Sequence, residues 1–218
     1  MPRAPPRTVV ALAGRCGAGK DAAADALARG LGFVNLKFAQ PLKDVAALLF
    51  GLPAECFSDR ALKDAPHAAL RGSSPREVLQ WLGTDVMQHG LQSAGLLPGV
   101  GRRFWAVRLA DAIDALPAEC DRVVISDMRF PHELELLRER FGDSHPAHRL
   151  VSVRLERGGG GSSSSSGAAA DHESESAVDG MDVDAVLRND GTLEQLEASV
   201  LRLALGRTNV RAQQQPGL

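Results

Sequence analysis

The sequence predicts an α/β fold of three layers, in which helices cover both faces of a mainly parallel, five-stranded sheet. Five short runs have the apolar or alternating pattern of strands, and they stand at residues 8–13, 33–39, 121–127, 150–155 and 183–188. Segments with the apolar spacing of helices separate these runs, and that alternation is typical of parallel sheets. The 218 residues suffice for one domain with a small insertion.

The most informative stretch is the glycine-rich segment Gly-Arg-Cys-Gly-Ala-Gly-Lys-Asp at 14–21, which joins the first strand to a segment of strong helix propensity. Its G-x-x-x-x-G-K spacing predicts a phosphate-binding loop, in which N–H groups surround a β-phosphate and Lys20 reaches the β- and γ-phosphates. Asp21 stands where a serine or threonine usually offers a hydroxyl to Mg²⁺. Its carboxylate either ligates the metal or only complements the helix dipole, and both roles stay open.

Composition narrows the expected partners. The 25 basic and 27 acidic residues give a net charge of −2, which argues against a nucleic-acid partner and favours small molecules. Cys16, Cys56 and Cys120 form no C-x-x-C pair, a pattern that favours a reducing compartment and no structural zinc. No apolar run approaches the ~18 residues that span a bilayer. We therefore expect a cytoplasmic protein that does not contact membranes.

The helix expected to follow the second strand runs from Gln40 to Phe50, with Pro41 in its first turn and Gly51 just past its end. Lys43 then lies near the carboxyl end of a strand, where ligands bind in parallel sheets. A solvated lysine is the alternative. Lys63, in the mixed segment that follows, is a weaker candidate.

A second helix is expected from residue 75, because Ser74 can cap it and Glu77 completes a capping box. Its apolar face leaves three polar residues, Arg76, Gln80 and Thr84, on another common face, which is either solvated or lines a cleft. In the amphipathic segment 104–113, Trp105 serves either as a core anchor or as a flat platform for a base.

The strand at 121–127 ends in Ser-Asp and should deliver the Asp127 carboxylate to the ligand edge of the sheet. In phosphate-loop enzymes such a carboxylate holds Mg²⁺ through water or orients the nucleophile. Arg129 follows two residues later and can neutralise phosphoryl charge. The next helix, from residue 131 to about 141, has Glu133 in its first turn.

Taken together, these segments resemble the phage and viral deoxynucleoside monophosphate kinases, a branch of the phosphate-loop nucleotide kinases. The matching blocks occur in the family's order between about residues 9 and 205 and read GRCGAGKD, FAQPLKD, REVLQWLGTD, FW, VISDMRFPHE, DHESE and NDGTLEQL. The resemblance implies transfer of the γ-phosphate of ATP to a deoxynucleoside monophosphate (dNMP), with Mg²⁺, giving ADP and the diphosphate.

The resemblance also implies roles for individual residues. ATP would be held by Arg15, Gly17, Ala18, Gly19, Lys20, Asp21 and Ala22, and by Asn189 and Gly191 near the adenine. The dNMP would be surrounded by Lys43, Arg76, Gln80, Thr84 and Trp105, with Asp127, Arg129 and Glu133 at the junction between the nucleotides. Lys20, Asp127 and Arg129 would be catalytic, and Asp21 is the candidate Mg²⁺ ligand.

The expected layout is a disordered lead at 1–7, a kinase domain at 8–206 and a disordered tail at 207–218. Within the domain we expect a helical dNMP-binding region at 41–116 and a lid at 157–176, flexible because of its glycine- and serine-rich tract. An engineered linker would also explain that tract.

Two departures from the family pattern leave alternatives open. Ala22 stands where the family commonly has threonine, and Gly17 stands where some members have a basic residue that Arg15 either replaces or does not. A kinase similar to phosphomevalonate kinase and a nucleotide-binding protein without turnover are the two rival interpretations. Both a monomer and a homodimer are compatible with the sequence.

Overall fold

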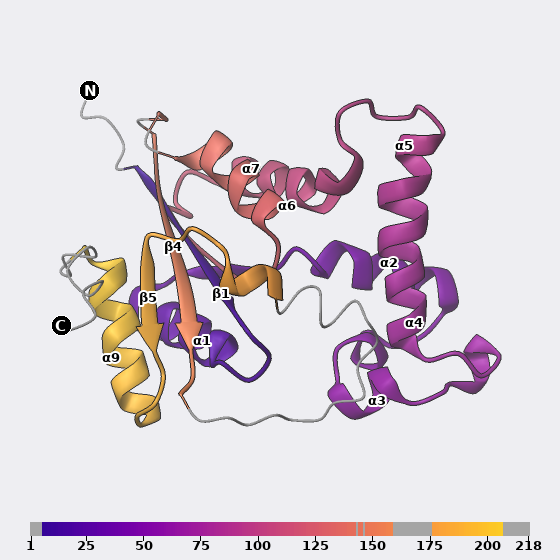
Figure 1. Ribbon diagram of the computed structural model, residues 1–218, viewed down its shortest axis with the longest axis horizontal. Coiled ribbons are helices and arrows are strands. Elements are labelled where there is room, and N and C mark those ends of the chain that lie inside the picture. The colour runs from indigo at the N-terminus through magenta and orange to yellow at the C-terminus, as the bar shows by residue number, and fades with distance from the viewer. Residues whose placement is uncertain (1–5, 143, 146, 159–175, 207–218) are drawn as a thin grey trace. The chain divides into compact units, whose positions relative to one another are not determined.

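The computed structural model describes residues 6–142, 144–145, 147–158 and 176–206 (Figure 1). The chain forms two compact units. One combines the segment up to Lys37 with the segment from Ala110 onward, and the other is Phe38–Leu109. The expected lid and tail lie largely or wholly outside the described residues, at 159–175 and 207–218.

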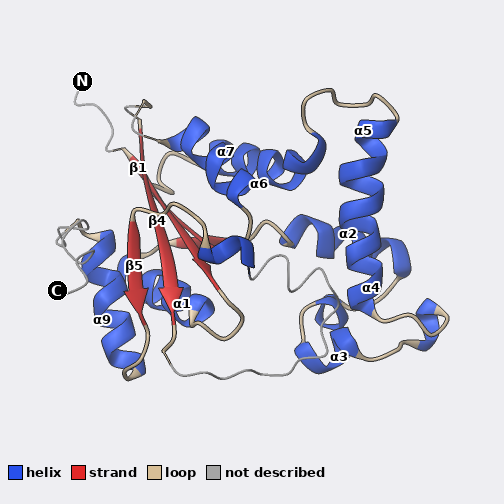
Figure 2. Ribbon diagram, in the orientation of Figure 1, coloured by secondary structure: helices blue, strands red, loops and turns tan. Residues whose placement is uncertain are grey.

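The first unit contains a parallel sheet of five strands, as predicted (Figure 2). Its order is β2-β3-β1-β4-β5, and every neighbouring pair is parallel. The strands are β1 (Arg7–Gly14), β2 (Val34–Leu36), β3 (Arg122–Met128), β4 (His148–Glu156) and β5 (Ala185–Arg188). Because all strands are parallel, their carboxyl ends lie at one edge, where ligands bind in such sheets.

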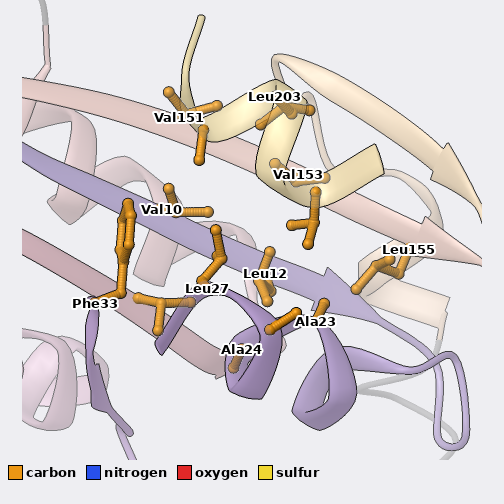
Figure 3. Packing of buried hydrophobic residues seen from close by; sticks show 14 of the residues in the cluster. Val10, Leu12, Ala23, Ala24, Leu27, Phe33, Val151, Val153, Leu155 and Leu203 are labelled. Atoms are coloured by element: carbon orange, nitrogen blue, oxygen red, sulfur yellow. The ribbon is translucent and has the colours of Figure 1, made fainter. Parts of the chain in front are cut away.

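Helices α1 (Lys20–Leu31) and α9 (Leu193–Ala204) cover one face of this sheet and pack together over it. Between them and the strands lies an apolar cluster, in which Leu27 and Leu203 meet Leu12 and Val153 (Figure 3). Helix α7 (Pro131–Phe141) packs on β4. Its Phe141 ring packs edge-on against His148. Successive side chains of a strand point to opposite faces, so His148 and Val153 of β4 lie on opposite faces of the sheet. Helix α7 therefore covers the face opposite α1 and α9. The unit therefore has the three layers expected.

The second unit is helical and has a core of its own around Ala46, Cys56, Phe57 and Leu82. Its α-helices are α2 (Gln40–Phe50), α3 (Arg60–Asp64), α4 (Pro75–Gln80), α5 (Leu91–Ser93) and the first part of α6 (Phe104–Asp114), and 3-10 turns stand at Ala54–Phe57, Ala68–Leu70 and Gly101–Arg103. Helix α2 ends at a left-handed Gly51, and Ser74 and Glu77 form the predicted capping box.

The helix expected from residue 75 differs from a regular α-helix. It is α-helical only to Gln80 and continues as a π-helix over Trp81–Gly90. The indole N–H of Trp105 donates to the Gly83 carbonyl oxygen at 3.0 Å, and an outside donor on a helical carbonyl competes with the regular backbone bond. Gly83 also has a low intrinsic helix propensity. Both effects favour the wider turn.

Four of the five strands also differ in length from the sequence-based expectation, and β2 and β1 are the cases with a bearing on the site and the lead. β2, an edge strand whose single neighbour is β3, comprises only three residues of the expected 33–39. β1 begins at Arg7, the last residue of the expected lead. The Arg7 guanidinium donates to the carbonyl oxygens of Leu116, Pro117 and Cys120 at 3.0–3.1 Å, which ties the start of β1 to the segment after α6. Within the described residues, no helix is both long and apolar enough to cross a membrane.

Candidate functional site

The glycine loop between β1 and α1 has a backbone that only glycine accepts at several points. Gly14, Gly17 and Gly19 have φ of 153°, 76° and 100°, values that side chains with a β-carbon rarely adopt. A Cβ on Gly14 would lie 2.7 Å from the Leu155 carbonyl oxygen, and one on Gly19 would lie 2.5 Å from the Asn189 amide nitrogen. The loop therefore presents backbone rather than side chains along this stretch.

The Lys20 side chain bonds back to the loop that precedes it. Its Nζ donates to the carbonyl oxygens of Gly14 at 2.6 Å and Arg15 at 2.9 Å, and the Ala18 N–H also donates to Arg15 at 3.1 Å. Burial lowers the pKa of Lys20, and the positive charge of Arg129 lowers it further. Asp127 and Arg129 stand at the carboxyl end of β3, where Met128 pairs with Ala13 just before the loop, and both charges act on the Lys20 ammonium group.

The first turn of α1 offers the donors of an anion site. The N–H groups of Lys20, Asp21 and Ala22 open the helix and have no acceptor within it, and they lie at the positive end of its dipole. Such a terminus binds phosphate groups. Polyphosphate binding at this end of α1 stays a prediction.

The Asp21 side chain is 77% exposed and forms an ion pair with Lys37, Oδ1 to Nζ, at 2.9 Å. Within the part of the chain that the structure describes, no three His, Cys, Asp or Glu residues gather as a metal site. Mg²⁺ commonly needs only one or two carboxylates, because phosphate oxygens and waters supply its other ligands. An exposed carboxylate on the first turn of α1 fits such a metal, so Asp21 remains the candidate ligand.

The Glu133 side chain contacts the backbone of the segment that carries Arg129. Its buried Oε2 accepts the backbone N–H groups of Arg129 at 2.7 Å and Phe130 at 2.9 Å. Burial raises the pKa of Glu133 to about 8, opposed by these two hydrogen bonds, while the nearby charge of Asp127 raises it further. The carboxyl group thus holds the backbone at the start of α7, and a direct contact with dNMP stays a prediction.

The two residues expected near the adenine, Asn189 and Gly191, have different surroundings. The Asn189 side-chain amide donates to the Ala18 carbonyl oxygen at 3.0 Å. Gly191 lies in the turn before α9, where a Cβ would collide with the Gln195 side chain. Asn189 is therefore in contact with the phosphate loop itself.

Asp179 is a loop partner that the sequence did not reveal. Its carboxylate binds the Arg15 guanidinium through two hydrogen bonds, one of them from Nε at 3.2 Å. This ion pair lowers the pKa of Asp179. Arg154 donates to the backbone carbonyls of Asp179 and Met181, both at 3.1 Å, and so fixes that segment. Arg15 and Asp179 are 164 positions apart, and no local pattern connects them.

The predicted dNMP residues outside the first unit all lie in the helical unit. Lys43 Nζ is 3.4 Å from Ser58 Oγ, and the Arg76 guanidinium makes a two-bond ion pair with Asp64 at 2.5 and 3.3 Å. Gln80 is exposed and Thr84 half-buried. Trp105 is half-buried, its indole N–H donates to the Gly83 carbonyl oxygen and its ring packs edge-on against Phe104. Its role as a platform for a base stays a prediction.

Comparison with known proteins identifies the family. The deoxynucleotide monophosphate kinase family matches residues 54–200, more than half of the chain. The chain belongs to this family. A mimivirus protein, provisionally named a deoxynucleotide monophosphate kinase, is 29% identical over 199 residues, which cover 88% of this chain and 94% of the relative. Membership of this kinase family makes the chain a nucleotide-binding transferase.

Similar solved structures are more distant in sequence. An unliganded sugar kinase from Janibacter is 19% identical, with a TM-score of 0.48 over 93% of this chain and 95% of that one. The APS kinase CysC from Mycobacterium tuberculosis, in complex with AMPPNP and APS, is 14% identical, with a TM-score of 0.44 over 91% and 98% of the two chains.

Proposed function

We propose that this deoxynucleotide monophosphate kinase transfers the γ-phosphoryl group of ATP to a dNMP and releases ADP and the corresponding diphosphate. The observation that carries the proposal is the loop at 14–21, whose backbone donors stand beside Lys20, Asp127 and Arg129 at one edge of the sheet. The relative from mimivirus bears the same activity in its provisional name.

The proposed chemistry relies on positioning and charge neutralisation. Phosphoryl transfer requires little covalent chemistry from the protein. The acceptor phosphate is already an anion, so no strong base is needed. The loop N–H groups hold the β-phosphate, and Lys20 exchanges its two carbonyl partners for phosphate oxygens. Arg129 neutralises charge that develops on the transferred group, and Asp127 orients the groups between the two nucleotides.

Mg²⁺ would neutralise phosphate charge when bound, and Asp21, the carboxylate of the loop segment itself, is the residue that would hold it. Oδ1 of Asp21 is paired with Lys37, so a metal would either share the carboxylate with Lys37 or displace it. Because that pair is exposed, it opposes the exchange only weakly. We therefore expect turnover to require Mg²⁺.

The helical unit is the proposed acceptor region. Arg76 and Lys43 are the cations suited to the monophosphate, and Gln80 and Thr84 offer polar groups on the same helical face as Arg76. Trp105 is the aromatic side chain assigned to the base. Arg76 must share its guanidinium with Asp64 or release it when the phosphate binds.

An acceptor panel with γ-labelled ATP and Mg²⁺ tests the proposal. The panel contains the four common dNMPs, the four matching ribonucleotides and phosphomevalonate, and the Arg129→Ala variant shows the background. We expect label on at least one dNMP. Label on phosphomevalonate alone would assign the chain to the rival kinase, and tight ATP binding without transfer to any dNMP would indicate a nucleotide-binding protein without turnover.

A further inference from the structure

Asn189 bridges the end of the sheet and the phosphate loop. It follows the last residue of β5, and its backbone N–H donates to the Glu156 carbonyl oxygen at 2.6 Å, which continues the pairing of β5 with β4. Its side chain is therefore carried by the sheet rather than by a free loop. From there the amide nitrogen reaches the Ala18 carbonyl oxygen at 3.0 Å.

The Asn189 amide also approaches the backbone of Gly19 closely. A β-carbon on Gly19 would lie 2.5 Å from the Asn189 amide nitrogen and 3.1 Å from Leu196 Cδ2. The absence of a side chain at Gly19 is what lets the amide approach the Ala18–Gly19 peptide. The nitrogen of the Asn189 amide, and not its oxygen, faces the Ala18 carbonyl, because two oxygen acceptors cannot form a hydrogen bond with each other.

The hydrogen bond fixes the direction of a neighbouring donor. The Ala18–Gly19 peptide is trans, so its N–H points opposite to its carbonyl. With the Ala18 carbonyl turned toward Asn189, the Gly19 N–H is turned away from it. Glycine at position 19 tolerates many backbone angles, so without a partner for the carbonyl this peptide could rotate and present an oxygen where the N–H stands.

Three other carbonyls of the loop have different partners. Lys20 binds those of Gly14 and Arg15, and the Ala23 N–H binds that of Gly19. Lys20 has to break its bonds to these carbonyls to reach phosphate. The bond from Asn189 to the Ala18 carbonyl does not have to be broken. Asn189 can therefore keep its bond throughout a catalytic cycle.

We propose that Asn189 is a positioning residue of the phosphate loop, which aims the Gly19 N–H at the polyphosphate by holding the Ala18 carbonyl. This inference rests on the proposed function, because it assumes that the loop binds the phosphates of ATP. It assigns Asn189 to the phosphate chain instead of the adenine. Loss of the residue should weaken binding of phosphates and leave recognition of the base and of dNMP unchanged.

Titration calorimetry with tripolyphosphate and with adenosine separates these two roles. In Asn189→Leu, which is similar in size but has no donor, we expect tripolyphosphate affinity to fall by about tenfold to a hundredfold, the scale of one hydrogen bond to a charged group. Asn189→Asp, the second variant, should lose at least as much, because it adds an acceptor and a negative charge. Adenosine affinity should stay within about twofold in both.

Steady-state kinetics supply a readout that a general loss of structure would not produce. The KM for ATP should rise in both variants while the KM for dNMP stays unchanged. Asp190→Asn is the matched control in the same turn, since its side-chain oxygen can still accept the Gly158 N–H, and it should retain both KM values.

Unchanged tripolyphosphate affinity in Asn189→Leu and Asn189→Asp, or an equal rise in both KM values, would overturn the role of Asn189 alone. A reduced affinity for adenosine with normal affinity for tripolyphosphate would return Asn189 to the adenine site and equally overturn it. If the unaltered chain binds neither tripolyphosphate nor ATP, the proposed function fails, and this inference fails with it.

Discussion

Replacing Glu133 by glutamine should remove a pH dependence that the buried carboxyl group gives to the stability of the fold. Burial raises the pKa of Glu133 in the folded state to about 8, whereas its ordinary value is 4.5. Between these values the folded chain keeps a proton that the unfolded chain releases. The unfolding free energy therefore falls as pH rises toward 8.

The size of the effect follows from the two pKa values. One proton bound only by the folded state changes the unfolding free energy by about 1.4 kcal/mol per pH unit. From pH 5.5 to 7.5 the loss is roughly 3 kcal/mol, a large share of the ~5–15 kcal/mol that stabilises a typical protein. Glutamine does not titrate but keeps a carbonyl oxygen that can accept the N–H groups of Arg129 and Phe130.

Urea denaturation at pH 5.5, 6.5 and 7.5 measures this difference. We expect the unfolding free energy of the unaltered chain to decrease across the series relative to that of Glu133→Gln. Glu77→Gln is the matched control, because Glu77 caps α4 in the same way but is exposed, and its hydrogen bonds with Ser74 hold its pKa below 4.5. Parallel pH profiles for the unaltered chain and Glu133→Gln would refute the reasoning.

Three further substitutions test the loop and its neighbours. Lys20→Met should lower kcat by about a hundredfold or more while circular dichroism stays unchanged, because Gly14 and Arg15 can offer their carbonyls to water; an unfolded variant would contradict this. Arg129→Ala should lower kcat on the same scale without changing Tm, and a normal rate would exclude Arg129. Gly14→Ala should cost about 1–3 kcal/mol in urea unfolding, since its Cβ meets the Leu155 oxygen at 2.7 Å; equal stability would refute the clash.

Local signals in the sequence were sufficient for much of the fold. The five strands, the capping box at Ser74 and the end of α2 at Gly51 each depend on residues a few positions apart. The loop at 14–21 was recognisable because glycines and a lysine at this fixed spacing are typical of phosphate-binding loops. Such patterns carry their information within one strand, turn or helix end.

The remaining features depend on contacts between distant residues. The π-helix follows a hydrogen bond between Trp105 and Gly83, which are 22 positions apart. The bond from Asn189 to Ala18 joins residues 171 positions apart. Glu133 was expected at the junction between the nucleotides, and only the packing of α7 reveals that its buried carboxyl group accepts the backbone N–H groups of Arg129 and Phe130. No local pattern encodes these partners.

The most direct test of the account is competition by a bisubstrate compound, adenosine joined through five phosphates to the deoxynucleoside of an accepted dNMP. Such a compound carries both nucleotides of the proposed transfer in one molecule. The account predicts inhibition that is competitive against both ATP and dNMP, with affinity above that of either substrate. Competition with neither substrate, or with ATP alone, would contradict the claim that the loop at 14–21 aims a triphosphate at a second nucleotide.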